Sequence, residues 1–138
     1  MKGRRTVLVC VTTQESSKQL VSAGKAVAEK SGASLEVVSV LPMEYNEKKT
    51  NPKTIEALYQ CAKEAGGEMA IYFSDDPILT VAAHIGKKKP ETLVVGFPKE
   101  DSNDFVSMIR LLLPELPISM VDGDKLYNML PLEAVSLR

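Results

Sequence analysis

Apolar residues occur along this chain in short continuous runs, and segments with helical periodicity separate the runs. The runs cover residues 7–11, 35–41, 68–73, 92–95 and 117–121, and most of them are rich in valine, leucine and isoleucine. Continuous apolar runs of this length are typical of parallel strands that are covered on both faces. Five such strands alternating with helices predict a three-layer α/β domain with right-handed crossovers.

Four helices are predicted between these strands, from apolar stripes and from residues that begin or end helices. Ser16 and Gln19 form a capping box before the first helix, and Gly32 is a natural stop after it. Pro52 and Pro77 suit the first turn of a helix, where a missing N–H costs nothing. The residues expected to face the sheet are Leu20, Ala23, Gly24, Val27, Ala28, Ile55, Leu58, Tyr59, Ala62, Ile78, Val81, Ala82, Ile85, Phe105, Met108, Ile109 and Leu112.

The last part of the chain is more apolar than a disordered end should be. The 138 residues suit one compact domain, which we expect to span residues 1–122, followed by an apolar extension at residues 123–138. Asp122 and Gly123 are a turn signal, so the extension is expected either to double back beside the fifth strand or to pack on a partner subunit. We predict a homodimer through the last strand and this extension, with a signalling protein as a second candidate partner.

The composition excludes several classes of partner. The chain is 25% charged with a formal net charge of −1, and no basic excess points to nucleic acid or to an anionic membrane surface. No apolar run approaches the ~20 residues of a spanning helix, so no membrane insertion is expected. The basic start KGRR leads into a run too short for a signal peptide, which predicts a cytoplasmic location.

Two cysteines and one histidine leave little room for metal or histidine-pair chemistry. Cys10 lies inside a strand and is predicted to be a buried small hydrophobe, whereas Cys61 lies towards the edge of a helix. His84 lies about 100° from the apolar stripe of its helix, so it is predicted to be a surface residue. The chain contains neither a Walker loop nor a nucleophile elbow, and no metal site or catalytic residue is predicted.

The segments VLVCVTTQESSKQLVSAGKAVAEKSGASLEVVSVLP and DDPILTVAAHIGKKKPETLVVG resemble the universal stress protein family. They are most similar to the version found in potassium-sensing histidine kinases, and the resemblance covers residues 5–122. It implies a Rossmann-like, adenine nucleotide alpha hydrolase-like domain with a five-stranded parallel sheet of order 3-2-1-4-5, frequently dimeric through the last strand. The resemblance does not decide whether this chain binds a nucleotide, since some members bind ATP and others do not.

The resemblance identifies positions for a nucleotide. ATP-binding members have an aspartate just after the first strand and a loop of form G-x-x-G-x9-G-(S/T) after the fourth. Here Thr12 replaces the aspartate, Thr13 follows where glycine is usual, and Gly96 matches the first loop glycine. Lys99 replaces the second loop glycine, and Val40 belongs to the segment that contacts adenine in those relatives. These five residues are the candidate cofactor-binding positions, although three of the four anchor features are missing.

The segment after Gly96 has the wrong charge for a phosphate loop, which needs free N–H groups and positive potential. In KEDSND, Asp101 and Asp104 are residues that cap a helix with their own oxygens and repel an incoming triphosphate. We therefore predict a regulatory or sensor-like module without tight ATP binding and without a cofactor. A third hypothesis is that the chain is a fragment or stand-alone relative of a sensor kinase's cytoplasmic domain. No kinase activity is predicted in that case either, because the chain contains no histidine-kinase catalytic segment.

Two alternatives stay open. Asp101, Asn103 and Asp104 could ligate a divalent cation that bridges them to phosphate, although the twelve-residue calcium-loop pattern is absent. An adenine-nucleotide-binding member, with ATP or AMP as its ligand and a slow ATPase activity, is the second alternative.

Overall fold

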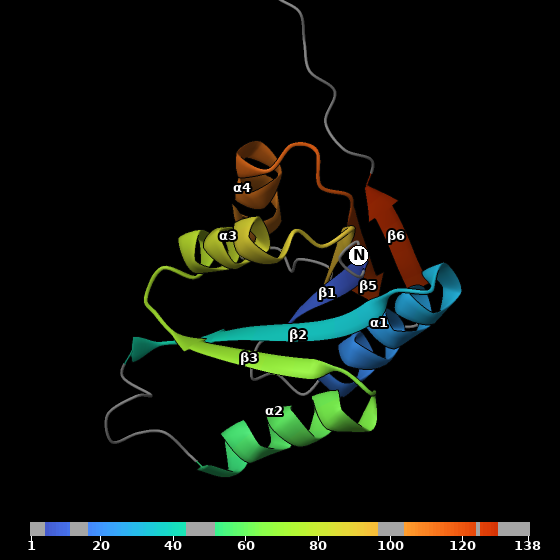
Figure 1. Cartoon of the computed structure of the whole chain (residues 1–138). Coiled ribbons are helices and arrows are strands. Elements are labelled where there is room, and N and C mark those ends of the chain that lie inside the picture. Colours follow the sequence, from blue (N-terminus) through green and yellow to red (C-terminus); the bar gives the residue numbers. More distant parts are fainter. Residues whose placement is uncertain (1–4, 12–16, 44–51, 97–103, 124, 130–138) are drawn as a thin grey trace, which may run out of the picture.

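A computed structural model of the chain describes residues 5–11, 17–43, 52–96, 104–123 and 125–129 (Figure 1). The predicted alternation of strands and helices is confirmed. The strands are β1 (Thr6–Val11), β2 (Ser34–Leu41), β3 (Glu68–Phe73), β4 (Thr92–Gly96), β5 (Ile118–Asp122) and β6 (Lys125–Met129). The helices are α1 (Ser17–Ser31), α2 (Pro52–Glu64), α3 (Pro77–Lys88) and α4 (Asp104–Leu112).

The strands form one sheet of order β3-β2-β1-β4-β5-β6. The predicted order of the first five strands is confirmed, and all of these pair in parallel. The prediction of five strands is wrong, because β6 pairs antiparallel with β5. Asp122 pairs with Lys125, so two residues make the turn, and Gly123 takes a φ of 66° that glycine adopts without steric cost. The start of the apolar extension therefore continues the sheet.

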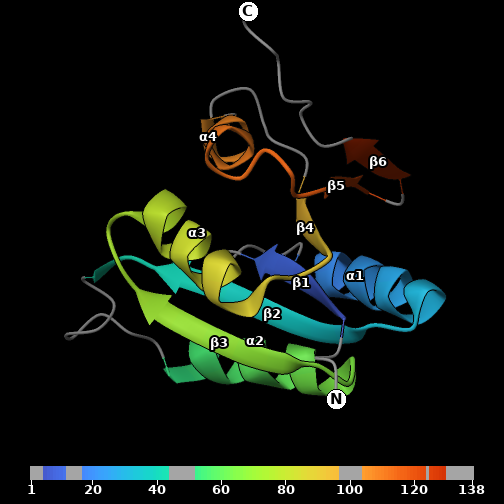
Figure 2. The same cartoon turned by 45° about the horizontal axis from the view of Figure 1, so that its top comes forward.

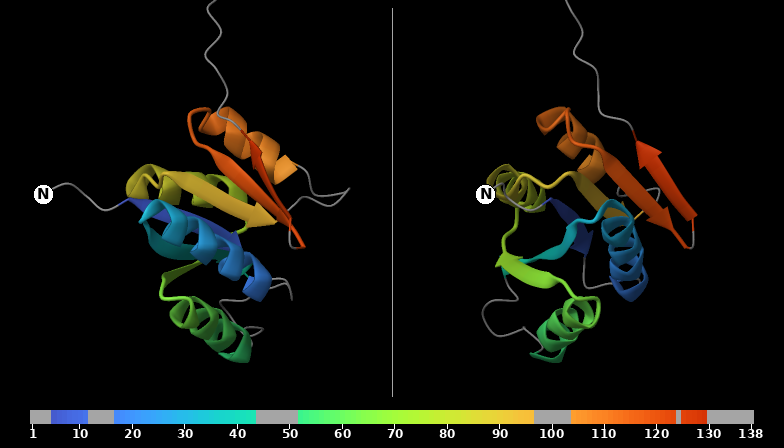
Figure 3. Two further views of the ribbon diagram at one scale, coloured as in Figure 1. Left: turned by 90° about the vertical axis from the view of Figure 1, so that its right-hand side faces the viewer. Right: turned by 45° about the vertical axis from the view of Figure 1, so that its right-hand side comes forward.

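Two helices cover each face of the sheet (Figures 2 and 3). Alternate residues of β1 contribute to the two sides: Val7 and Val9 pack in the core beneath α1 and α2, and Leu8 packs in the core beneath α3 and α4. All three side chains are fully buried. Continuous apolar strands are therefore required here, because neither face of the sheet meets water.

The signals for helix ends are confirmed where the structure describes them. Asp76 Oδ1 accepts a hydrogen bond from the Leu79 N–H at 3.2 Å, and Pro77 is the first residue of α3. Gly32 follows α1 with a left-handed φ of 69°. The capping box predicted from Ser16 lies outside the described residues, and α1 begins at Ser17.

The predicted inward stripes are correct for most helices and wrong for part of α4. Val106 and Ile109 carry the packing of α4, whereas Met108 and Leu112 are 40% and 44% exposed. Tyr59 on α2 is also wrongly predicted, since it is 50% exposed. The error in α4 has a simple cause: the apolar stripe of DFVSMIRLL covers more than half of the helix, so it is wider than the face that packs on the sheet.

Candidate functional site

The carboxyl ends of the parallel strands meet at one edge of the sheet, where β1 and β4 lie side by side. The chain leaves β1 towards α1 on one face and leaves β4 towards α4 on the other. Such a change of direction is a topological switch point, and ligands of open α/β sheets bind in the crevice outside it. The fold thus has its topological switch point at the carboxyl ends of β1 and β4, which makes this edge the candidate ligand site.

The structure describes two of the five predicted site residues. Gly96 is exposed at the end of β4, at the switch point. Val40 is half-buried in β2 opposite Tyr72, and it packs against the core beneath α3 and α4. Thr12, Thr13 and Lys99 lie outside the described residues, so their predicted roles stay predictions.

Ser39, which precedes Val40 in the same segment of β2, adds a polar group near this edge. It is completely buried, opposite Val11, the last residue of β1. Within the described part of the chain its Oγ atom has no hydrogen-bond partner. An unsatisfied buried hydroxyl costs about 1–3 kcal/mol, so a ligand that supplied a hydrogen bond would gain binding free energy. In the sequence, Ser39 differs from its neighbours as a polar residue inside the apolar end of SLEVVSVL.

The space beside Gly96 also fits a ligand close to the backbone. Among the described residues, a Cβ atom built on Gly96 would meet one heavy atom within 4 Å, Leu20 Cδ2 at 4.0 Å. The packing of these residues therefore does not require glycine at this position. An open backbone at the end of a strand and an orphaned hydroxyl two strands away, at the end of β2, are features that a small polar ligand can use.

A second polar cluster lies on the other side of the sheet and contradicts the prediction for His84. His84 is only 3% exposed, and its Nδ1 atom lies 2.8 Å from the Tyr72 hydroxyl. Its Nε2 atom lies 3.2 Å from Glu36 Oε1, and Lys88 Nζ lies 3.5 Å from Glu36 Oε2. The prediction of a surface histidine is wrong because the polar side of α3 faces polar residues of β2 and β3 instead of water.

The hydrogen bonds of His84 assign it a structural role. Nδ1 faces the Tyr72 hydroxyl and Nε2 faces the Glu36 carboxylate, so both ring nitrogens have a hydrogen-bond partner. The rings of Tyr72 and His84 also meet edge to face, with centroids 5.5 Å apart. The cluster ties α3 to β2 and β3, and its carboxylate is compensated by Lys88.

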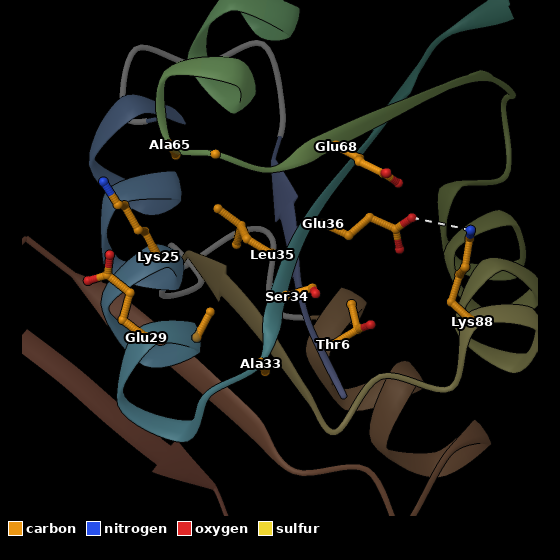
Figure 4. A pocket seen from close by; sticks show the side chains of 12 residues that line it. Thr6, Lys25, Glu29, Ala33, Ser34, Leu35, Glu36, Ala65, Glu68 and Lys88 are labelled. Carbon is orange, nitrogen blue, oxygen red and sulfur yellow. Dashed lines mark ion pairs between the residues drawn. The ribbon is translucent and has the colours of Figure 1, made fainter. Parts of the chain in front are cut away.

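Glu36 and Lys88 also line a hollow of about 460 Å³ at the opposite, amino-terminal edge of the parallel strands (Figure 4). Its charged residues have both signs: Lys25 and Lys88 against Glu29, Glu36 and Glu68. Mixed charges give no net field for an anion. Within the described ranges, no three side chains of His, Cys, Asp or Glu are placed to hold a metal ion. Asp101 and Asn103 of the alternative cation site lie outside those ranges.

Neither cysteine is an activated nucleophile. Cys10 is half-buried against the core beneath α3 and α4, and burial raises its pKa to about 12. The pKa of Cys61 is also raised, mainly by desolvation. Thiols react as thiolates, so the reactivity of both cysteines is low near neutral pH.

Among the described helices, none has the length and apolar composition of a membrane-spanning helix.

No protein-family model matches the chain, and no curated protein matches its sequence. Solved structures match its fold. A universal stress protein in complex with cAMP is 17% identical, with a TM-score of 0.64 over 87% of this chain and 98% of its own. The dAMP complex of a universal stress protein from Archaeoglobus fulgidus is 14% identical, with a TM-score of 0.58 over 86% and 97%. Universal stress protein UspA from Lactobacillus plantarum is 13% identical, with a TM-score of 0.60 over 88% and 100%.

Proposed function

We propose that this chain, which has the fold of universal stress proteins, is a regulatory module that does not bind ATP tightly. The observation that carries the proposal is the sequence that follows the exposed end of β4. Gly96 is followed by FPKEDSND, which contains three acids, one lysine and no further glycine. A triphosphate at the switch point would face this acidic segment.

None of the described strand ends at this edge carries a positive charge that would compensate for the acids after Gly96. β1, β2 and β4 end in Val11, Leu41 and Gly96, and β5 ends in Asp122. Like charges in a binding interface cost on the order of several kcal/mol, which is enough to remove useful affinity for a triphosphate. A role in regulation, through contact with a signalling protein, needs no catalytic residue, and we propose none.

Calorimetric titration with ATP and Mg²⁺ tests this proposal. We expect a dissociation constant on the order of 1 mM or weaker, and a micromolar value would overturn the proposal. If acidity is the cause, the double variant Asp101→Asn/Asp104→Asn should bind ATP at least about tenfold more tightly. The matched control is Glu64→Gln/Glu115→Gln, which removes two acids at the end of α2 and before β5. An equal gain in both variants would mean that overall charge, and not the segment, controls affinity.

A second candidate function is recognition of an adenine nucleoside monophosphate at the same edge. It is favoured by the orphaned Ser39 hydroxyl and by the open backbone at Gly96. Two structures with this fold were solved with cAMP or dAMP bound, and these ligands carry one phosphate instead of three. AMP should then bind more tightly than ATP, because less negative charge meets the acidic segment.

Ser39→Ala separates this candidate from a purely structural role of the serine. The variant should unfold at the same or a higher denaturant concentration, since it removes an unsatisfied hydroxyl. It should also weaken AMP binding about tenfold, if the hydroxyl contacts the ligand. Ser119→Ala is the control, because Ser119 is also buried but donates to Asn128 Oδ1 at 2.6 Å. An unchanged AMP affinity in Ser39→Ala would remove Ser39 from the site.

We also propose that the chain forms a homodimer, now through the outer edge of β6. The outer edge of β5 is already paired with β6. β6 is the last strand of the sheet, and its side chains Leu126 and Tyr127 are 43% and 41% exposed. An edge strand presents unpaired backbone groups that another strand can complete.

A further inference from the structure

The outer face of α4 is apolar although it lies on the surface. Val106 and Ile109 face the sheet and are 7% and 0% exposed. Met108, Leu111 and Leu112 are 40%, 68% and 44% exposed, and their spacing of three and four residues places them on one outer face of the helix. Contiguous exposed apolar side chains of this kind mark a surface that another segment covers.

The register of β6 brings the chain back to this helix. Met129, the last residue of β6, pairs with Ile118, the first residue of β5. Ile118 belongs to the buried core beneath α3 and α4, and α4 ends at Leu112, shortly before it in the chain. In Figure 1, α4 and the arrowhead of β6 lie at the same end of the sheet. β6 therefore ends at the same end of the sheet as α4.

The segment that follows has the composition and length to cover α4. Residues 130–138 read LPLEAVSLR and contain four large apolar side chains: Leu130, Leu132, Val135 and Leu137. Nine extended residues span up to ~30 Å, whereas a nine-residue helix is ~14 Å long. The segment is thus long enough to run along the whole of α4.

We propose that residues 130–138 of the same chain pack on the outer face of α4, against Met108, Leu111 and Leu112. The same chain is the favoured source because β6, after which the segment follows, ends at the same end of the sheet as α4. A tethered segment has an effective local concentration in the millimolar range, which a second copy does not reach in dilute solution. This packing would hide the apolar face of α4 from water. The inference does not depend on nucleotide binding.

Photo-crosslinking in the full chain tests the proposal. Leu111→p-benzoylphenylalanine places a reactive group on the outer face of α4, and mixing ¹⁴N-labelled with ¹⁵N-labelled protein distinguishes bonds within a chain from bonds between chains. We expect crosslinks to residues 130–138 that join only fragments of the same isotope. Crosslinks of mixed isotope, crosslinks to other segments, or none at all would each overturn the proposal. Tyr59→p-benzoylphenylalanine is the control, since Tyr59 is 50% exposed on α2, across the sheet.

Hydrogen exchange gives a second readout that needs no bulky probe. The variant Leu132→Ser/Leu137→Ser should raise amide exchange in α4 roughly tenfold, because the helix loses its cover. Exchange in α2 should stay unchanged. Equal exchange of α4 in the variant and the parent chain would contradict the proposed packing.

Discussion

The Nε2 atom of His84 lies 3.2 Å from Oε1 of Glu36, and both side chains are almost fully buried. The two residues are 48 positions apart, on α3 and β2. This hydrogen bond joins a helix to the second strand of the sheet, beside a core that is otherwise apolar. Removing one partner of such a buried polar pair is costly, because the other partner stays buried without its hydrogen bond.

The first prediction concerns this asymmetry. His84→Leu should lower the free energy of unfolding by about 3 kcal/mol, because Glu36 then retains only Lys88. The double variant Glu36→Met/His84→Leu should recover most of that loss, since replacement of both partners by apolar groups is often nearly neutral. Urea denaturation measures both. Lys87→Ala, exposed on α3, should stay within about 0.5 kcal/mol of the parent. A double variant less stable than His84→Leu would contradict the argument.

The second prediction uses two glycines that both lie inside helices. A Cβ atom on Gly24 would lie 2.2 Å from Val9 Cγ2, so α1 can approach β1 closely only without a side chain there. Gly24→Ala should destabilise the fold by about 1–3 kcal/mol through overpacking. Gly86→Ala on α3 meets nothing within 4 Å and should stabilise by about 0.5–1 kcal/mol. Thermal or urea unfolding should therefore give opposite signs, and a tolerated Gly24→Ala would mean that α1 moves freely away from the sheet.

The third prediction concerns pH and Cys10. Burial raises the thiol pKa from its ordinary value of 9.0 to about 12 in the folded chain. Above pH 9 the unfolded chain therefore loses this proton while the folded chain keeps it. Stability then falls as pH rises from 9 to 12, by up to about 1.4 kcal/mol per pH unit from this group. The contribution is fully present below pH 9.

Cys10→Ala isolates this contribution from the lysines and tyrosines that titrate in the same range. The variant should show a shallower loss of stability between pH 9 and pH 12 than the parent chain. In the native parent at pH 8, a thiol reagent should react slowly at both cysteines and rapidly only after unfolding. Identical pH slopes for parent and variant would show that Cys10 is not protected in solution.

These residues also show how much of the fold could be predicted from the sequence. Local signals were sufficient where the cause is local: Asp76 with Pro77 began α3, and Gly32 followed the end of α1. A return of the chain beside the fifth strand was one of two alternatives, and the pairing of β6 with β5 confirms it. The sequence did not decide between the alternatives because KLYNM is short and mixes polar with apolar residues. A turn at Asp122 and Gly123 was its one signal.

The site was harder to predict because its partners are distant in sequence. His84 reads as a surface residue on its own helix, and only its contacts with Glu36 and Tyr72 explain its burial. Ser39 reads as part of a strand core, and only the burial of its hydroxyl without a partner in the described residues singles it out. Of the positions implied by the resemblance, Gly96 lies at the switch point, and among the described residues the space around its backbone is open. Periodicity reports which side of an element is apolar, but not which polar residues meet across elements.

The last prediction tests the homodimer and its contact. Light scattering should give twice the mass of one chain, and Leu126→Lys should return the protein to a monomer, because a charge on β6 would be buried in the dimer. Leu79→Lys is the matched control: Leu79 is 58% exposed on α3, away from that edge, and this variant should stay dimeric. A parent chain that remains monomeric at high concentration would rule out the dimer. A dimer that survives Leu126→Lys but not Leu79→Lys would move the contact to the face of α3, where the sheet edge plays no part.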